Sequence, residues 1–142
     1  MASAQATVLI NEPIEKVFEF ILNGENNRLW RPSVTEIKAM TKPIGVGTVF
    51  YQRMLGPNGI KIEADYEIIE CDRNKKIAFK VLNGPYRAVG TFDFTAIEKT
   101  TKVRFCFSEN ASQVAETVKK IHLQRVVDTL INVKEYLDQQ SK

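Results

Sequence analysis

The hydrophobic and polar positions of the chain follow two different periods, and the change of period separates strands from helices. Residues 6–10 form an apolar, β-branched run that is typical of a strand. Asn11 or Glu12 can then cap a helix that has Pro13 in its first turn. Along this helix the apolar residues recur every three or four positions, at Ile14, Val17, Phe18 and Ile21. The pattern predicts a strand followed directly by an amphipathic helix.

A second, shorter helix is predicted over residues 25–30. Asn23 and Gly24 interrupt the first helix, and Pro32 ends the second one. The second helix carries Trp30, the single tryptophan of the chain. A large aromatic side chain is most often a plug in the core, and the alternative, that Trp30 lies near one end of an internal cavity, comes only from the family resemblance given below.

Period-two alternation then dominates the middle of the chain. It predicts six strands, over residues 34–40, 48–54, 60–71, 76–82, 86–96 and 101–108. The connections are short and rich in turn-forming residues, so the strands should form an antiparallel meander. Most strands have one apolar and one polar face, which indicates a sheet covered on one side. The strand at 48–54 is ambiguous in phase. Before it, either Gly45 or Gly47 is expected to have a positive φ.

One long C-terminal helix is predicted over residues 112–138, and it is the element available to cover the sheet. Its broad apolar face contains Ala115, Val118, Ile121, Val126, Leu130, Val133 and Leu137. Four polar or aromatic side chains lie in or beside the middle of that face: His122, Arg125, Thr129 and Tyr136. They either find partners within the chain or face a cavity that holds water or a ligand.

The same helix has a second, narrower apolar line. It consists of Leu123, Val127 and Ile131, spaced by four residues. We expect this line to pack on the N-terminal helices, and the alternative is an exposed surface for another molecule.

Composition limits the classes of function. The 142 residues are 44% hydrophobic and 26% charged, which fits a single globular domain over residues 1–142. A net charge of +3, spread along the chain, argues against nucleic-acid binding. No apolar run reaches the roughly 20 residues of a membrane span, and no secretory signal is visible, so a cytoplasmic location is expected. With one His and no CxxC spacing, we expect no metal site and two free thiols, Cys71 and Cys106.

The order of elements and two local motifs resemble a known superfamily. Residues 8–40, VLINEPIEKVFEFILNGENNRLWRPSVTEIKAM, contain an apolar strand, a small-x-Pro-x-x-x-Val-Phe helix start and a Trp-x-Pro exit. Residues 42–53, KPIGVGTVFYQR, contain a Gly-x-Gly turn and a following strand. Both segments resemble the bacterial polyketide cyclase/dehydrase and lipid-transport family of the START-like (SRPBCC) superfamily. The resemblance implies an α+β helix-grip fold, also called START-like or pollen-allergen-like. In it a seven-stranded antiparallel sheet wraps around a long C-terminal helix, with two short helices after the first strand.

The resemblance implies that a hydrophobic small molecule, lipid- or polyketide-like, is bound or transported in a cavity between the sheet and the C-terminal helix. The alternative is a polyketide cyclase/dehydrase that acts in the same cavity, and a third class is a chaperone-activator-like interaction module. A binding module leads because it needs only the aromatic lining. No nucleophile elbow, P-loop or dinucleotide motif is present, and no catalytic residue is assigned.

The sequence predicts a set of ligand-binding residues, no cofactor, and a monomer or homodimer. The predicted ligand-binding residues are Trp30, Tyr66, Phe79, Tyr86, Phe92, Phe105, His122, Arg125 and Thr129. The apolar body of the ligand should lie against the rings of the sheet. Its polar end should then lie at His122 or Arg125 of the C-terminal helix.

Overall fold

The computed structural model describes residues 2–56, 59–83, 87–111 and 116–140. Along the chain the elements are β1 (Ala2–Ile10), α1 (Ile14–Leu22), the 3-10 turn η1 (Gly24–Asn26), α2 (Asn27–Trp30), β2 (Val34–Ala39), β3 (Val49–Leu55), β4 (Lys61–Glu63), β5 (Tyr66–Asp72), β6 (Lys76–Val81), β7 (Arg87–Ile97), β8 (Thr100–Ala111), α3 (Glu116–Asp128) and α4 (Leu130–Gln140). The predicted order of strand, two short helices, strands and C-terminal helix is therefore confirmed.

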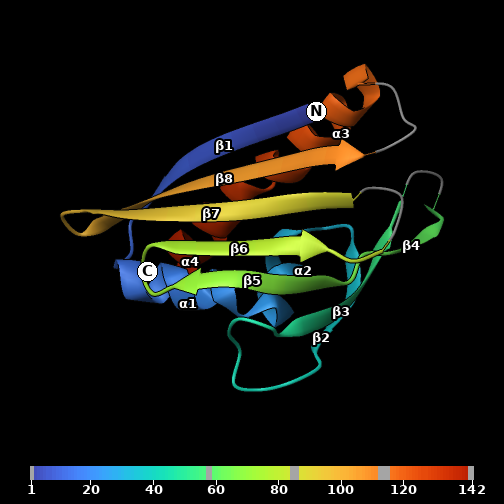
Figure 1. Ribbon diagram of the computed structural model, residues 1–142. Coiled ribbons are helices and arrows are strands. Elements are labelled where there is room, and N and C mark those ends of the chain that lie inside the picture. Colours follow the sequence, from blue (N-terminus) through green and yellow to red (C-terminus); the bar gives the residue numbers. More distant parts are fainter. Residues whose placement is uncertain (1, 57–58, 84–86, 112–115, 141–142) are drawn as a thin grey trace.

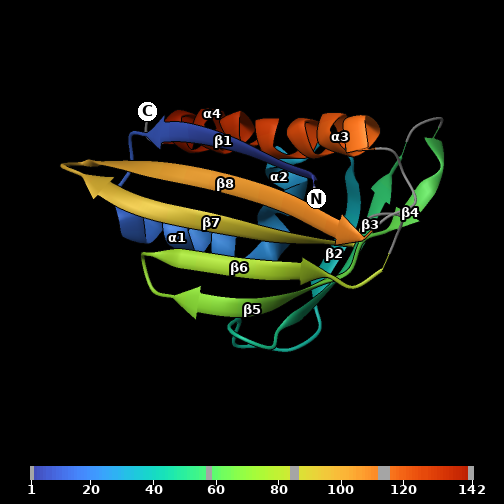
Figure 2. The same cartoon turned by 45° about the horizontal axis from the view of Figure 1, so that its top comes forward.

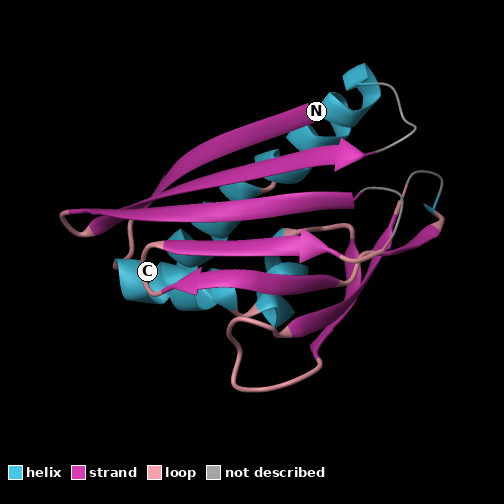
Figure 3. Cartoon of the chain, in the orientation of Figure 1, coloured by secondary structure: helices cyan, strands magenta, loops and turns pink. Residues whose placement is uncertain are grey.

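The strands form one antiparallel sheet in the order β1-β8-β7-β6-β5-β3-β2, with β4 paired to β3 at one end. The described helices lie on one side of the sheet (Figures 1 and 3). α3 and α4 pack against β1, and α3 also against β8, while α1 contacts β7 and β8. Figure 2 shows α3 and α4 running beside β1, with α1 and α2 under the middle of the sheet. The sheet therefore curls around both helical parts, as the helix-grip fold class predicts.

The apolar face of the sheet was predicted correctly from β5 to β8. Its buried side chains are Tyr66, Ile68, Ile77, Phe79, Ala88, Phe92, Phe94, Val103, Phe105 and Phe107. The register places Phe92 opposite both Ile77 and Phe105. Rings from neighbouring strands therefore meet on the covered face, which is how cross-strand pairs stabilise a sheet.

The predicted strand at 60–71 is two strands, because the chain breaks at Asp65. The Asp65 carboxylate accepts hydrogen bonds from the backbone N–H of Gln52 at 2.9 Å, from Arg53 Nη1 at 2.7 Å and from Asn83 Nδ2 at 3.1 Å. A side chain thus takes the place of a ladder hydrogen bond to β3. The structure therefore has one strand more than the predicted seven among the described residues.

The ambiguous phase of β3 has a simple cause: a polar side chain points inward. Phe50 is fully buried, and Gln52 on the same face is 2% exposed. Gln52 Nε2 donates to the carbonyl of Ala64 at 3.1 Å, so its amide has a buried partner. Ahead of this strand, Gly47 has φ +91°, which confirms the expectation of a positive φ in the Gly-x-Gly turn.

The C-terminal helix is not continuous, contrary to the prediction. It is interrupted at Thr129, between α3 and α4. The Thr129 hydroxyl donates to the carbonyl of Val126 at 2.5 Å, and the Thr129 N–H bonds the same carbonyl at 3.2 Å. Back-bonding by a threonine hydroxyl is a known cause of bends in helices, and here it accompanies the break.

The break also explains an error in the predicted helix face. Leu123 and Val127, assigned to the narrower line, are completely buried, whereas Ile121 of the predicted broad face is 56% exposed. α3 packs on β1 and β8 rather than on the N-terminal helices. Ile131, the third member of the narrower line, is 43% exposed. Of the predicted broad face, Val126 of α3 and the α4 residues Leu130, Val133 and Leu137 are buried as expected.

The sequence also led to predictions about the cysteines, metal ligands and membrane-spanning segments. Cys71 and Cys106 both have free thiols. Within the described ranges, no three His, Cys, Asp or Glu side chains are grouped so that they could hold a metal ion. Among the helices of the same ranges, none is both long and apolar enough to cross a membrane.

Candidate ligand-binding site

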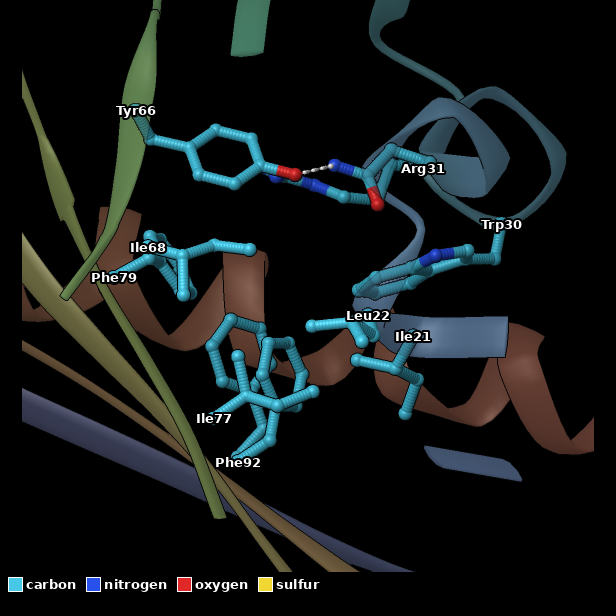
Figure 4. Close-up of a pocket in the computed structure, with 11 residues that line it drawn as sticks. Ile21, Leu22, Trp30, Arg31, Tyr66, Ile68, Ile77, Phe79 and Phe92 are labelled. Carbon is cyan, nitrogen blue, oxygen red and sulfur yellow. Dashed lines mark hydrogen bonds between the residues drawn. The ribbon is translucent and has the colours of Figure 1, made fainter. Parts of the chain in front are cut away.

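A small cavity lies between the N-terminal helices and the inner face of the sheet. The space open to the centre of a water molecule is about 20 Å³. Its lining comes from α1, α2, the residue after α2, and strands β5 to β8: Ile21, Leu22, Asn27, Trp30, Arg31, Tyr66, Ile68, Ile77, Phe79, Phe92 and Phe105. Figure 4 shows these side chains converging from the strands and from the helix pair.

The walls of the cavity are aromatic rings in contact with one another. Phe92 and Phe105 stack with centroids 4.2 Å apart, and Phe79 lies 6.0 Å from Phe92. Trp30 meets Phe92 edge-on at 6.4 Å, and Tyr66 lies 5.1 Å from Phe79. The Trp30 ring is 3% exposed. Trp30 is therefore part of the core and also one wall of the cavity, so both interpretations of this residue hold.

The interior is much fuller than the hollow space expected from the sequence. A cavity of about 20 Å³ has room for roughly one water molecule. The rings on the sheet are large enough to reach the helix pair and fill most of the distance between the layers. A ligand of several carbon atoms therefore has to displace side chains in order to enter.

A short chain of hydrogen bonds fixes the polar end of the cavity. Asn27 Nδ2 donates to Tyr66 Oη at 3.1 Å and to Gln52 Oε1 at 3.2 Å, so α2 is joined to β5 and β3. Burial raises the pKa of Tyr66 well above its usual value, although the hydrogen bond from Asn27 and the charge of Arg31 oppose the rise. The phenol therefore keeps its proton at neutral pH.

Arg31 places a positive charge at the same end of the cavity. It directly follows α2, and it is 9% exposed. Its guanidinium carbon lies 5.9 Å from the centre of the Trp30 ring. Burial lowers the pKa of Arg31, and the neighbouring Tyr66 opposes this shift. Arginine starts from a pKa so high that the side chain stays charged.

Five of the nine predicted ligand-binding residues line the cavity: Trp30, Tyr66, Phe79, Phe92 and Phe105. Tyr86 lies outside the described residues, and so does the side chain of His122, whose backbone belongs to α3. The expected meeting of the rings with the C-terminal helix is not what the lining shows, because the side chains opposite the rings come from α1, α2 and Arg31.

Two predicted residues of the C-terminal helix are placed elsewhere. Arg125 is exposed, so the expectation that it faces the interior is wrong. Thr129 is half-buried and bonds its own helix through Val126. The helical phase was extended across the break at Thr129, and this put Arg125 on the wrong face.

Sequence reasoning missed the two polar residues that do reach the cavity, Asn27 and Arg31. Asn27 is in the second predicted helix, in a polar stretch, and Arg31 lies between Trp30 and Pro32. The available signal was the Trp-x-Pro motif itself, since a residue held between a buried Trp30 and a fixed Pro32 has little freedom to turn outward.

Comparisons with known proteins agree with this fold. A START superfamily protein from Mycobacterium smegmatis has a similar structure, with a TM-score of 0.84 and 11% identity over 99% of both chains. Protein TTHA0849 of Thermus thermophilus has a TM-score of 0.80 and 19% identity over 99% of both chains. XoxI of Bacillus cereus has a TM-score of 0.75 and 16% identity, covering 100% of this chain and 99% of its own. Among curated proteins, none matches the sequence significantly.

The family comparison covers almost the whole chain. Residues 1–135 of the 142 match the family described as polyketide cyclase/dehydrase and lipid transport. The antiparallel sheet, the helix pair after β1 and the C-terminal helices are arranged as in the START superfamily structure above. The resemblance drawn from residues 8–40 and 42–53 is thereby confirmed, and the protein belongs to the polyketide cyclase/dehydrase and lipid transport family.

Proposed function

We propose that the protein binds a hydrophobic small molecule, lipid- or polyketide-like, in the cavity between the N-terminal helices and the sheet. The observation that supports this most directly is the composition of the lining. Apolar and aromatic side chains form the walls, and Asn27, Arg31 and Tyr66 meet at one end. Small-molecule sites in proteins combine apolar walls with a few convergent polar groups in this way. The family description, which includes lipid transport, points in the same direction.

Binding is better supported than acid–base catalysis by the groups that line the cavity. A binding site needs walls and hydrogen-bond donors, and the lining supplies both. General acid–base catalysis also needs a group that takes up a proton from the substrate. Tyr66 holds its proton because its pKa is raised, and Arg31 is already charged.

The cavity is too small for the proposed ligand, so binding requires the cavity to enlarge. About 20 Å³ does not hold a lipid or a polyketide. α2 has only four residues, and it is tied to the sheet through Asn27. We infer that the ligand enters by moving the helix pair and its side chains away from the strands, and that the bound state has a larger cavity.

The test is saturable binding of a neutral, environment-sensitive apolar dye to the folded protein, combined with mass spectrometry under native conditions to detect a retained small molecule. Ile68→Phe fills the cavity, since Ile68 lines it and is 1% exposed. Ile69→Phe is the matched control, because Ile69 is the next residue and is 40% exposed. We expect Ile68→Phe to weaken dye binding at least tenfold and Ile69→Phe to leave it unchanged. A native protein with no saturable site would contradict the proposal.

A further inference from the structure

Arg31 is a buried cation that the described chain does not neutralise. The side chain is 9% exposed, and none of the described residues forms an ion pair or a hydrogen bond with its guanidinium. The guanidinium lies over the Trp30 ring and near the phenol of Tyr66. A buried charge is normally paired, because removing an ion from water without a partner is costly.

Two further side chains of the cavity, Trp30 and Tyr66, are also donors that need an acceptor. Trp30 Nε1 is buried and, among the described residues, has no hydrogen-bond partner. Tyr66 Oη already accepts from Asn27 Nδ2 at 3.1 Å, so the phenolic proton is left to donate. The indole N–H and the guanidinium N–H groups can only donate. Three side chains that line one small cavity thus offer hydrogen atoms, and none of the three donates to an acceptor in the described part of the chain.

We propose that the ligand carries a single carboxylate, which pairs with Arg31 at the polar end of the cavity, while its apolar body lies against Phe79, Phe92 and Phe105. This inference rests on the proposed function, because it specifies the ligand of the same cavity. A carboxylate supplies only acceptors and matches the fork of a guanidinium with two parallel hydrogen bonds. It therefore meets the requirement of all the unpaired donors together.

The charge of the site favours one carboxylate over a doubly charged head. Among the described residues, Arg31 is the only cationic side chain in the lining. One carboxylate brings the buried charge to zero, whereas a phosphate monoester dianion leaves an excess negative charge in an apolar space. A neutral alcohol accepts one hydrogen bond but leaves the guanidinium charge uncompensated. The expected order of affinity is therefore carboxylate, then alcohol or phosphate.

The experiment compares ligands that differ only in the head group. Decanoic acid is paired with 1-decanol and decyl phosphate, and 3-phenylpropanoic acid with 3-phenylpropan-1-ol, at pH 8, where the acids are ionised. Binding is followed by the fluorescence of Trp30, the single tryptophan, which lines the cavity. In the native protein we expect each acid to bind at least tenfold more tightly than its alcohol, and decanoic acid more tightly than decyl phosphate.

Two arginines of the same segment provide a matched pair of variants. Arg31→Met removes the buried charge and keeps an unbranched side chain. Arg28→Met makes the same change in α2 at an exposed residue. We expect Arg31→Met to lower the affinity for the acids at least tenfold and to leave that for the alcohols within about twofold, so that the preference disappears. Arg28→Met should keep the native preference. Circular dichroism verifies folding, and Arg31→Gln serves as a second neutral variant.

Each outcome decides the proposal. Alcohols that bind as well as the acids, tighter binding of decyl phosphate, or a preference that persists in Arg31→Met and Arg31→Gln would overturn the carboxylate assignment and leave the cavity as a hydrophobic site. If neither acids, alcohols nor the neutral dye bind, the proposed function itself fails. A preference that is lost only in the Arg31 variants supports the assignment.

Discussion

Gly24 leaves the space that the hydroxyl group of Tyr66 occupies. A Cβ atom built at Gly24 would lie far inside van der Waals contact with Tyr66 Oη, and it would also press on the ring of Phe50. The backbone of Gly24 does not have the positive φ that favours glycine. Space, rather than backbone conformation, is therefore the reason for glycine here, and this residue helps to set the position of Tyr66 in the site.

Gly24→Ala should disturb both stability and binding. The added methyl group must displace Tyr66 or Phe50, both buried, which we expect to cost about 1–3 kcal/mol of the free energy of unfolding. Because Tyr66 moves, affinity for the neutral dye should fall as well. Chemical denaturation and dye titration measure the two effects.

Gly45→Ala is the control for this substitution. A Cβ atom at Gly45 meets nothing within 4 Å, and its φ is not positive. Its free energy of unfolding should change by no more than about 0.5 kcal/mol. If Gly24→Ala were as neutral as Gly45→Ala, the close approach of Tyr66 to the backbone would be wrong.

Phe92 lies at the centre of the ring cluster, and its removal tests how full the interior is. The ring is 5% exposed and stacks on Phe105 at 4.2 Å. In a filled core, Phe92→Ala should cost about 3–5 kcal/mol of the free energy of unfolding. Val89→Ala, on the same strand at a residue that is 40% exposed, should cost less than about 1 kcal/mol. A loss of similar size in both variants would indicate a loosely packed interior.

The break between β4 and β5 depends on one carboxylate. Partial burial acts to raise the pKa of Asp65, but the N–H of Gln52, the amide of Asn83 and the guanidinium of Arg53 together lower it below its usual value. The hydrogen bonds to the Asp65 carboxylate therefore contribute to the free energy of unfolding in a way that depends on pH. Since the folded pKa is the lower one, this contribution is complete above the unfolded pKa of about 4 and is lost as the pH falls through the folded value.

Asp65→Asn should remove this dependence. Near pH 7 the variant should be less stable than the native protein by about 1–3 kcal/mol, because hydrogen bonds to a charged group are lost. Below pH 4 the difference between the two proteins should begin to shrink, and it should approach zero once the pH is below the lowered folded pKa of Asp65, where the folded protein is also protonated. Urea denaturation at a series of pH values measures this. A difference that stays constant from pH 7 to pH 2 would show that Asp65 acts only by its shape.

The elements that were predicted correctly are those whose signal is local. β5 to β8 alternate because one face of each strand is buried, and α1 shows its buried residues at helical spacing. The break at Asp65 was missed because the partners of its carboxylate, Gln52, Arg53 and Asn83, come from other parts of the chain. The break at Thr129 was missed because it contains neither Gly nor Pro, and the faces of α3 were then assigned wrongly.

Only the part of the site that has a local signal in the sequence was predicted. The rings of the lining lie on the apolar face of the sheet, which the alternation gives directly. The polar end was not predicted, because a buried arginine is rare and the Trp-x-Pro motif was taken only as a sign of the fold. The hydrogen bonds from Asn27 to Tyr66 and Gln52 come from tertiary structure that no local spacing encodes.

At the scale of the whole molecule, the helices that cover the sheet have two separate positions. α3 and α4 pack along β1, and α3 also on β8, while the cavity lies under β5 to β8 and is closed by α1, α2 and Arg31. α4 is joined to the helix pair by a hydrogen bond from Asn132 Nδ2 to the Trp30 carbonyl at 2.9 Å and by the stacked rings of Phe20 and Tyr136. Both of these contacts are made by α4 and not by α3. A movement of the helix pair that enlarges the cavity would therefore act on α4, while α3 stays packed on β1 and β8.

This arrangement predicts which backbone amides change their hydrogen exchange when a ligand binds. Because the cavity of about 20 Å³ must enlarge, the amides whose exchange changes most should be those of α1, α2 and β5, which line it, and of η1, which joins the two helices. The amides of α3, which packs on β1 and β8, should change little. Hydrogen exchange followed by mass spectrometry, with and without a saturating neutral dye, measures this directly. The Ile68→Phe protein, at a dye concentration that saturates only the native protein, provides the blank. If the largest change were instead in residues 116–128, the ligand would lie against the C-terminal helix, and the site described here would be misplaced.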